Sequence, residues 1–143
     1  MKTIPNDVFF SEVASQLLEN KEVVVRLRGT SMLPLLDEKR HSLVLSAELG
    51  DLRVGDVVLF NYNGSCLLHR IRKIRGEDIT LQGDAVPHRE LCTRHDVVAV
   101  LLKVIDRQTG KVTDCRSAEW RRISRRTLFW KRIKRTVKKI IRK

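Results

Sequence analysis

The stretch DVVLFNYNGSCLLHRIRKI (residues 56–74) decides the fold class. It contains two runs rich in apolar and β-branched residues, DVVLF (56–60) and CLLHRIRKI (66–74), which are typical of β-strands. The link between them contains Asn63-Gly64, a dipeptide that favours the tight turn of a β-hairpin. The stretch therefore predicts two antiparallel strands at the centre of the chain.

Similar strand patterns occur on both sides of this hairpin. The other predicted strands are KEVVVRLR (21–28), HSLVLSA (41–47), DITLQG (78–83), DVVAVLLKVID (96–106) and, as an edge strand, KVTDC (111–115). Short turns such as Arg75-Gly76-Glu77 separate several of these strands. Six or seven strands with short connections predict a mainly β domain with an antiparallel sheet, coiled or barrel-like.

The two ends of the chain show a helical period instead. Residues 6–19 predict a short helix that begins at Asn6, ends near Asn20 and has one apolar face, made of Phe10, Val13, Ala14, Leu17 and Leu18. From about Ala118 a second apolar row predicts a long helix, with Trp120, Ile123, Trp130, Ile133, Val137, Ile140 and Ile141. We therefore divide the chain into an N-terminal helix (1–20), a β-rich domain (21–115) and a basic amphipathic helical tail (116–143).

The net charge of +12 lies almost wholly in this tail. Residues 116–143 carry thirteen of the 29 basic residues and one acid, Glu119, so the rest of the chain is balanced. Three roles fit such a helix: lying on anionic lipid, contacting the phosphates of nucleic acid, or packing its apolar row on the β domain. The aromatic residues on the row and the lack of a base-reading motif favour an anionic membrane surface, bound through residues 117–143, over nucleic acid.

Composition also indicates a compartment. The chain has three cysteines, an odd number without paired spacing, which favours a reducing compartment over a disulfide framework. No secretory signal and no apolar run long enough to span a membrane is visible. We expect a cytoplasmic protein that is peripherally associated with a membrane.

One group of residues has a spacing that can bind zinc. His88, Cys92 and His95 form H-x3-C-x2-H, and Glu90 could be a fourth ligand. A polar surface loop explains the same residues, and we prefer it. We therefore expect no metal and no other cofactor.

The stretch RLRGTSMLPLLDE (26–38) surrounds a serine, Ser31, with small and apolar neighbours. A turn serine beside a core segment is the ordinary explanation for this stretch alone. The alternative is a nucleophile in a peptide-binding groove, since glycine permits close approach of another chain and proline stiffens the turn. The residues expected to line such a groove are Gly29, Thr30, Met32, Leu33 and Pro34.

Several motifs, taken together, favour the second explanation. GTSMLP (29–34), VGDVVLF (54–60), LHRI (68–71) and LQGDA (81–85) occur in this order. Over about residues 24–105 the sequence resembles the signal peptidase I superfamily, which also contains the self-cleaving SOS (LexA-like) repressors. The resemblance implies their coiled β-sheet fold, a serine endopeptidase activity and a preference for small residues before the cut.

The resemblance also implies the catalytic residues. Ser31 matches the nucleophile, and His69 stands where many relatives have lysine, as in the endoplasmic-reticulum and sporulation branch. An unperturbed histidine is partly a free base at neutral pH, whereas a lysine must be strongly desolvated to act as one. A third residue, an acid, could orient the imidazole. Asp84 matches the family's GD motif and is preferred, Glu90 is the second candidate, and Asp56 is expected to hold a turn.

Departures from the family pattern keep alternatives open. Gly29 stands where signal peptidases often have a serine, so backbone N–H groups, with Thr30, would hold the oxyanion. The family's N-terminal membrane anchor is not seen, and the residues after Asp84 lack the usual asparagine. A catalytically silent peptide-binding relative, or a repressor-like regulator whose tail binds nucleic acid, would fit too. The absence of a helix-turn-helix pattern and of an Ala-Gly or Cys-Gly cleavage site counts against the regulator.

Overall fold

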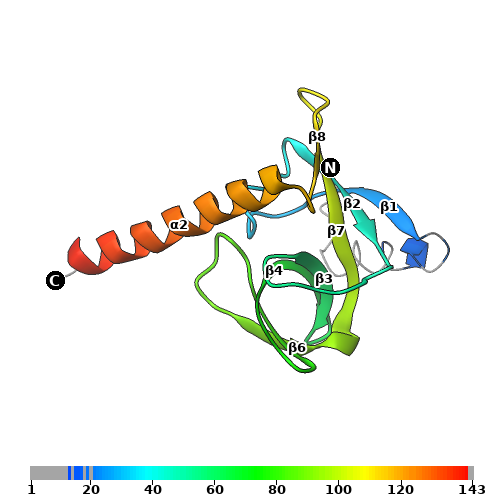
Figure 1. Cartoon of the computed structure of the whole chain (residues 1–143), viewed down its shortest axis with the longest axis horizontal. Helices are drawn as coiled ribbons and strands as arrows, with labels where there is room; N and C mark the ends of the chain where they lie inside the picture. Colours follow the sequence, from blue (N-terminus) through cyan, green and yellow to red (C-terminus); the bar gives the residue numbers. More distant parts are fainter. Residues whose placement is uncertain (1–12, 14, 18, 20, 142–143) are drawn as a thin grey trace.

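The computed structural model describes residues 13, 15–17, 19 and 21–141. Its centre is one antiparallel sheet, which curls into a half-barrel (Figure 1). The strands are β1 (Glu22–Arg26), β2 (His41–Ser46), β3 (Val57–Tyr62), β4 (Ser65–Arg75), β5 (Asp78–Gln82), β6 (Glu90–Thr93), β7 (Val97–Asp106) and β8 (Val112–Asp114). Their order is β1-β2-β7-β3-β4-β5-β6, and β8 pairs with β7. The predicted mainly β fold with a barrel-like sheet is confirmed.

The hairpin at residues 56–74 forms as the sequence predicts. β3 and β4 are antiparallel, and Tyr62 pairs with Ser65 across a two-residue turn. Asn63 and Gly64 occupy this turn with φ angles of 48° and 80°. Both residue types adopt positive φ at low cost, which explains why this dipeptide sets the register of the central strands.

The core consists of two clusters on opposite faces of the central strands. Successive side chains of a strand point to opposite faces, and β3 is buried on both. Val57 and Leu59 of β3 lie in the first cluster, whereas Val58 and Phe60 lie in the second. β4 divides in the same way, so its neighbouring residues face different surroundings.

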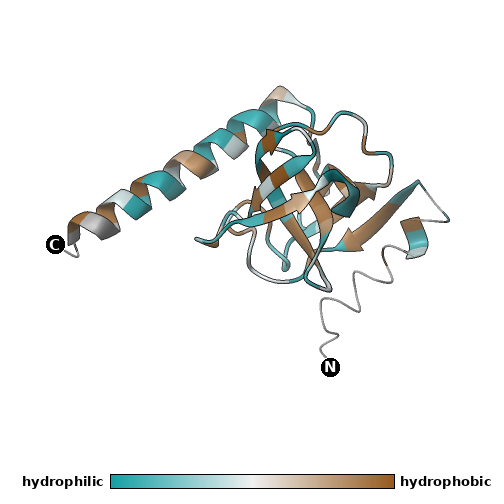
Figure 2. Cartoon of the chain, turned by 90° about the horizontal axis from the view of Figure 1, so that it is seen from below, coloured by the Kyte–Doolittle hydropathy of each residue, from teal (hydrophilic) through white to brown (hydrophobic). Residues whose placement is uncertain are grey.

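Helical residues before the sheet and the first turn of the helix after it pack against the first cluster. The described residues Val13 and Leu17 are helical and buried there, on the predicted apolar face, whereas the predicted helix ends at Asn6 and Asn20 lie outside the described residues. The C-terminal helix α2 (Ala118–Ile141) places Trp120, in its first turn, in the same cluster. The helix then projects away from the sheet (Figure 1). Coloured by hydropathy, α2 is largely hydrophilic with interspersed apolar residues (Figure 2).

One strand was not predicted. We expected a polar surface loop at residues 88–95, but β6 lies here and pairs with β5. Its side chains alternate, with Glu90 and Cys92 buried and Leu91 exposed. A buried glutamate and an exposed leucine reverse the usual pattern of a strand, which is why sequence periodicity did not reveal it.

Candidate active site

Ser31 lies in a tight turn whose following residues are anchored in the core. The backbone N–H groups of Leu33 and Leu36 donate to the carbonyls of Thr30 and Met32, at 3.2 and 3.0 Å. Met32 and Leu36, which follow Ser31, are buried in the first core cluster, whereas Ser31 itself stays half-buried. Among the described residues, the Ser31 hydroxyl and its backbone N–H make no hydrogen bond, so both are available to a ligand.

His69 is a buried residue of β4 with an acid on one side of its ring. Its Nδ1 contacts a carboxylate oxygen of Glu90, which reaches it from β6. Both side chains are almost fully buried, and the His69 ring lies 6.0 Å from that of Phe60. A carboxylate in this position fixes the ring orientation and stabilises the imidazolium form.

Gly83 brings the histidine and the serine together. A Cβ atom at this glycine would lie 2.7 Å from the Ser31 carbonyl oxygen and 2.9 Å from His69 Nε2. The two atoms can therefore be no farther apart than the sum of these distances. The N–H of Ala85 donates to the same Ser31 carbonyl, at 2.8 Å, which fixes the serine turn on this loop. Only glycine at this position leaves room for both the Ser31 carbonyl and the His69 ring.

The expectation that Asp84 orients the histidine is corrected by the structure. Its two carboxylate oxygens accept from Nε and Nη2 of Arg70, both at 2.9 Å, in a fully buried pair. Arg70 also donates to the Gly55 carbonyl and to Ser124 of α2. Arg70 follows His69 directly in β4, so the two side chains point to opposite faces of the sheet, and Asp84 lies on the face of Arg70. Glu90, the second candidate, contacts the histidine instead.

The residues predicted to line a peptide groove divide into two sets. Leu33 and Pro34 line a groove of about 810 Å³. Met32 does not, because it is buried in the core, where its sulfur accepts from the Asp84 N–H at 3.4 Å. Gly29 donates to Glu38 at 2.9 Å, and Thr30 is exposed. Apolar character alone could not separate core anchors from groove walls in this stretch.

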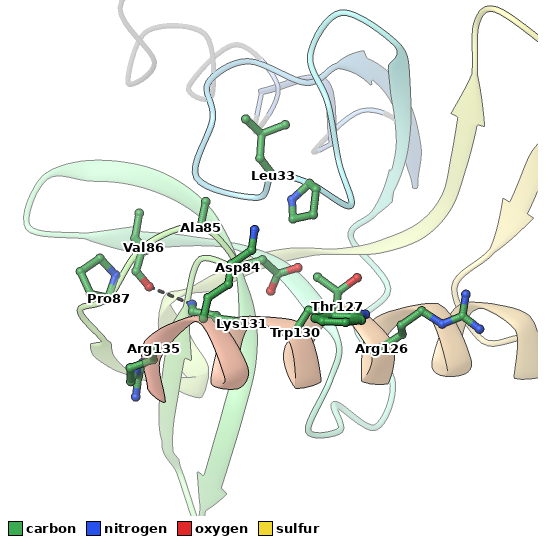
Figure 3. Close-up of a pocket in the computed structure, with 12 residues that line it drawn as sticks. Leu33, Asp84, Ala85, Val86, Pro87, Arg126, Thr127, Trp130, Lys131 and Arg135 are labelled. Carbon is green, nitrogen blue, oxygen red and sulfur yellow. Dashed lines mark hydrogen bonds between the residues drawn. The ribbon is translucent and has the colours of Figure 1, made fainter. Parts of the chain in front are cut away.

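The groove lies between the serine turn and α2, as Figure 3 shows. One side is formed by Leu33 and Pro34, and another by the loop from Asp84 to Pro87. The helix supplies the remaining residues, which are Arg126, Thr127, Trp130, Lys131, Lys134 and Arg135. The groove is thus apolar near the serine turn and basic along the helix.

Lys131 ties the helix to the loop beneath the candidate dyad. Its ammonium group donates to the carbonyls of Gly83 and Val86, both at 2.9 Å. Figure 3 shows the second of these bonds. Burial lowers the pKa of Lys131, and Arg72 lowers it further. Sequence reasoning missed Lys131, Arg70 and Ser124, because their roles depend on contacts between segments far apart in the chain.

Two other predicted elements can be placed. Asp56 holds a turn as expected, since its carboxylate accepts from the Arg53 N–H at 2.9 Å. His88, Cys92 and His95 do not gather: within the described part of the chain, no three potential ligand side chains lie close enough to hold a metal. Burial raises the pKa of the Cys92 thiol to about 11, as it does for Cys66. These protonated thiols are poor nucleophiles near neutral pH.

From Phe129 onwards, α2 exposes several of its apolar residues. Phe129, Trp130, Val137 and Ile140 are all about half exposed or more. Among the residues that the structure describes, no helix is long and apolar enough to cross a bilayer. Comparison of the chain with family models, with curated proteins and with solved structures finds no match.

Proposed function

We propose that the protein is a serine endopeptidase whose Ser31 is the nucleophile, His69 the general base and Glu90 the residue that orients the base. The observation that carries this proposal is the placement of one buried imidazole. Its Nδ1 meets the buried Glu90 carboxylate, and its Nε2 faces Gly83, where the Ser31 turn is anchored. The motif resemblance to signal peptidases names the same serine and histidine independently.

The proposed reaction follows from this arrangement. His69 Nε2 accepts the hydroxyl proton as Ser31 Oγ attacks the peptide carbonyl carbon, and Glu90 stabilises the imidazolium. The backbone N–H of Ser31 is available to the oxyanion. His69 then gives its proton to the leaving amine as the C–N bond breaks. Water, deprotonated by His69, attacks the acyl-enzyme, and the proton returns to Ser31 as the acid product leaves.

An extended peptide is the substrate that fits the surroundings. β1, which leads into the serine turn, is the first strand of the sheet order and pairs only with β2 among the described strands. A peptide could add to its other edge through main-chain hydrogen bonds. Leu33 and Pro34 would then contact apolar substrate side chains. Processing of a signal-like or leader-like peptide fits this groove and the motif resemblance.

Cleavage of a peptide library by the full chain tests the proposal. The wild type, Ser31→Ala and His69→Ala are compared with anionic vesicles present, and circular dichroism controls for folding. We expect cleavage by the wild type and a loss of about 10³-fold or more in both folded variants. Cleavage that survives Ser31→Ala would overturn the mechanism. Binding of peptides without cleavage by any of the three proteins would identify a silent, peptide-binding relative.

We also propose that α2 holds the protein on an anionic membrane surface. The support is the exposed apolar set on its second half combined with its many basic residues. Each basic residue near such a surface contributes about 1 kcal/mol. Removal of residues 117–143 would also remove buried Trp120, so point substitutions are the cleaner test.

The membrane test compares two double variants in vesicle flotation. Val137→Gln/Ile140→Gln removes exposed apolar groups from α2, whereas Val24→Gln/Val112→Gln removes similarly exposed groups from the sheet. We expect only the first to reduce flotation with phosphatidylglycerol vesicles. Equal flotation of both would contradict the membrane role of α2. Tight binding of a DNA oligonucleotide together with no flotation would favour nucleic acid instead.

A further inference from the structure

A second hollow, of about 360 Å³, lies beside α2 and differs from the groove in its charge. Gln82, Leu128 and Phe129 form part of its lining. The remaining lining residues are all basic: Arg72, Arg89, Arg125, Lys131, Arg132 and Arg135. We call this set the basic hollow. No acidic side chain is among its lining residues within the described chain.

The positive charges of the basic hollow are close enough to repel one another. Burial lowers the pKa of Arg72, and Arg89 lowers it further. Lys131 shows the same two effects, with Arg72 as one of the basic neighbours. The acid that acts on both groups is Asp84, but its two oxygens are already bound by Arg70. The like charges therefore repel one another across the hollow, and a bound anion would reduce this repulsion.

The basic residues also approach from two sides. Arg72 belongs to β4, and Arg89 directly precedes β6. The helix α2 supplies Arg125, Arg132 and Arg135. Arginine side chains present planar pairs of donors that match the oxygens of a phosphate group. The hollow has less than half the volume of the groove, which suits a compact anion better than a peptide.

We propose that the basic hollow is a binding site for a phosphate group, carried either by a lipid headgroup or by a free phosphate ester. Gln82 supports the wall of this site, since its amide donates to the carbonyls of Val86 and Pro87 at 3.0 and 3.1 Å. The site is separate from the proposed dyad, and its test reads binding rather than cleavage. Failure of one proposal therefore leaves the other standing.

The test uses two double variants of the full chain with the same loss of charge. Arg89→Gln/Arg132→Gln removes two exposed arginines from the hollow, one from each side. Lys73→Gln/Arg75→Gln removes two exposed basic residues of β4 that do not line it. Calorimetry measures the binding of inorganic phosphate and of glycerol phosphate at constant ionic strength. Flotation compares phosphatidylglycerol with phosphatidylcholine vesicles.

We expect the wild type and the β4 variant to bind phosphate with the same affinity. The affinity of the hollow variant should be lower by about tenfold or more. Arg121→Gln/Arg122→Gln, which removes two exposed arginines of α2 that do not line the hollow, is the control for flotation. A loss of phosphatidylglycerol flotation larger than in this control would identify the lipid headgroup as the source, and a loss no larger than in the control would identify a free phosphate ester. No phosphate binding by the wild type would overturn the proposal. An equal loss in both variants would overturn it too, because net charge alone would then explain the binding.

Discussion

Neighbouring residues of β4 carry two buried acid–base pairs on opposite faces of the sheet. Arg70 holds Asp84 through two hydrogen bonds, and its remaining nitrogen, Nη1, donates to the Gly55 carbonyl and the Ser124 hydroxyl. His69 contacts one oxygen of Glu90, whose other oxygen is buried without a hydrogen bond among the described residues; His88 Nε2 is 3.4 Å from it.

The difference between the pairs separates structure from chemistry. An arginine stays charged at every physiological pH and cannot accept a proton, so a saturated Arg–Asp pair can only hold segments together. A histidine can give and accept a proton near neutral pH. A carboxylate with an oxygen that lacks a hydrogen bond, such as Glu90, can stabilise the positive charge of the protonated imidazole. The following predictions test this division, from the largest expected effect to the smallest.

Glu90→Gln is expected to reduce catalysis far more than stability. The amide keeps the size of the side chain but cannot stabilise an imidazolium, so kcat should fall by about 10²–10⁴-fold. Peptide cleavage and urea unfolding measure the two effects on the same protein. Cleavage at the normal rate by this variant would show that Glu90 has no part in the mechanism. The His69–Glu90 pair would then be structural, like the Arg70–Asp84 pair.

Arg70→Met is expected to show the opposite balance. It leaves the Asp84 carboxylate buried without its partner, which should lower the free energy of unfolding by about 3–5 kcal/mol. Urea denaturation measures this loss. Addition of Asp84→Leu should recover part of it, since the double variant no longer buries an unpaired charge. If the double variant is no more stable than Arg70→Met, the pair is not the source of the cost.

Gly83→Ala is expected to affect both sides of the comparison moderately. The added methyl group would lie 2.7 Å from the Ser31 carbonyl oxygen. Because this oxygen is a backbone atom, the clash can be relieved only by a shift of the serine turn or of the Gly83 loop. We expect a stability loss of about 1–3 kcal/mol and reduced cleavage. The matched control is Gly110→Ala, in a turn with φ of 77° and open space around it. The control should cost about 1–2 kcal/mol and leave cleavage unchanged; equal cleavage by both variants would contradict the close approach.

The buried thiols should be silent in catalysis and visible only at high pH. Burial raises the pKa of Cys66 and Cys92 to about 11, so the folded state favours the protonated form. Their stabilising contribution is complete below the unfolded thiol pKa, about 8.5, and is lost as pH rises towards 11. Urea unfolding at several pH values measures this decline. Iodoacetamide at pH 7 should leave cleavage intact, and inactivation would point to a cysteine nucleophile.

Local patterns predict much of the fold. The Asn63-Gly64 turn and the apolar runs beside it predict the central hairpin, because turn residues and β-branched runs act over a few neighbours. β6 escaped because its buried position carries Glu90 rather than an apolar residue. Its burial depends on His69, which lies 21 residues earlier and belongs to a different strand.

The candidate site was predictable only in part. Motif resemblance names Ser31 and His69, and the structure brings the turn of one near the ring of the other. The motif resemblance could not decide between Asp84 and Glu90. The two acids lie six residues apart, and only the structure shows that they are on opposite sides of the sheet. The choice depends on where Arg70 points and on a strand that periodicity did not reveal. The contribution of α2 to the groove likewise depends on the long-range contacts of Lys131.

The shared position of Lys131 has a consequence for ligand binding. It lines both the groove and the basic hollow, and two of the three donor hydrogens of its ammonium group are used on Gly83 and Val86. The third is left for a phosphate, so a bound anion and the loop that carries Gly83 would share one ammonium group. A peptide in one hollow and an anion in the other would therefore be linked thermodynamically. Whatever factor the anion applies to peptide affinity, the peptide must apply to the anion's.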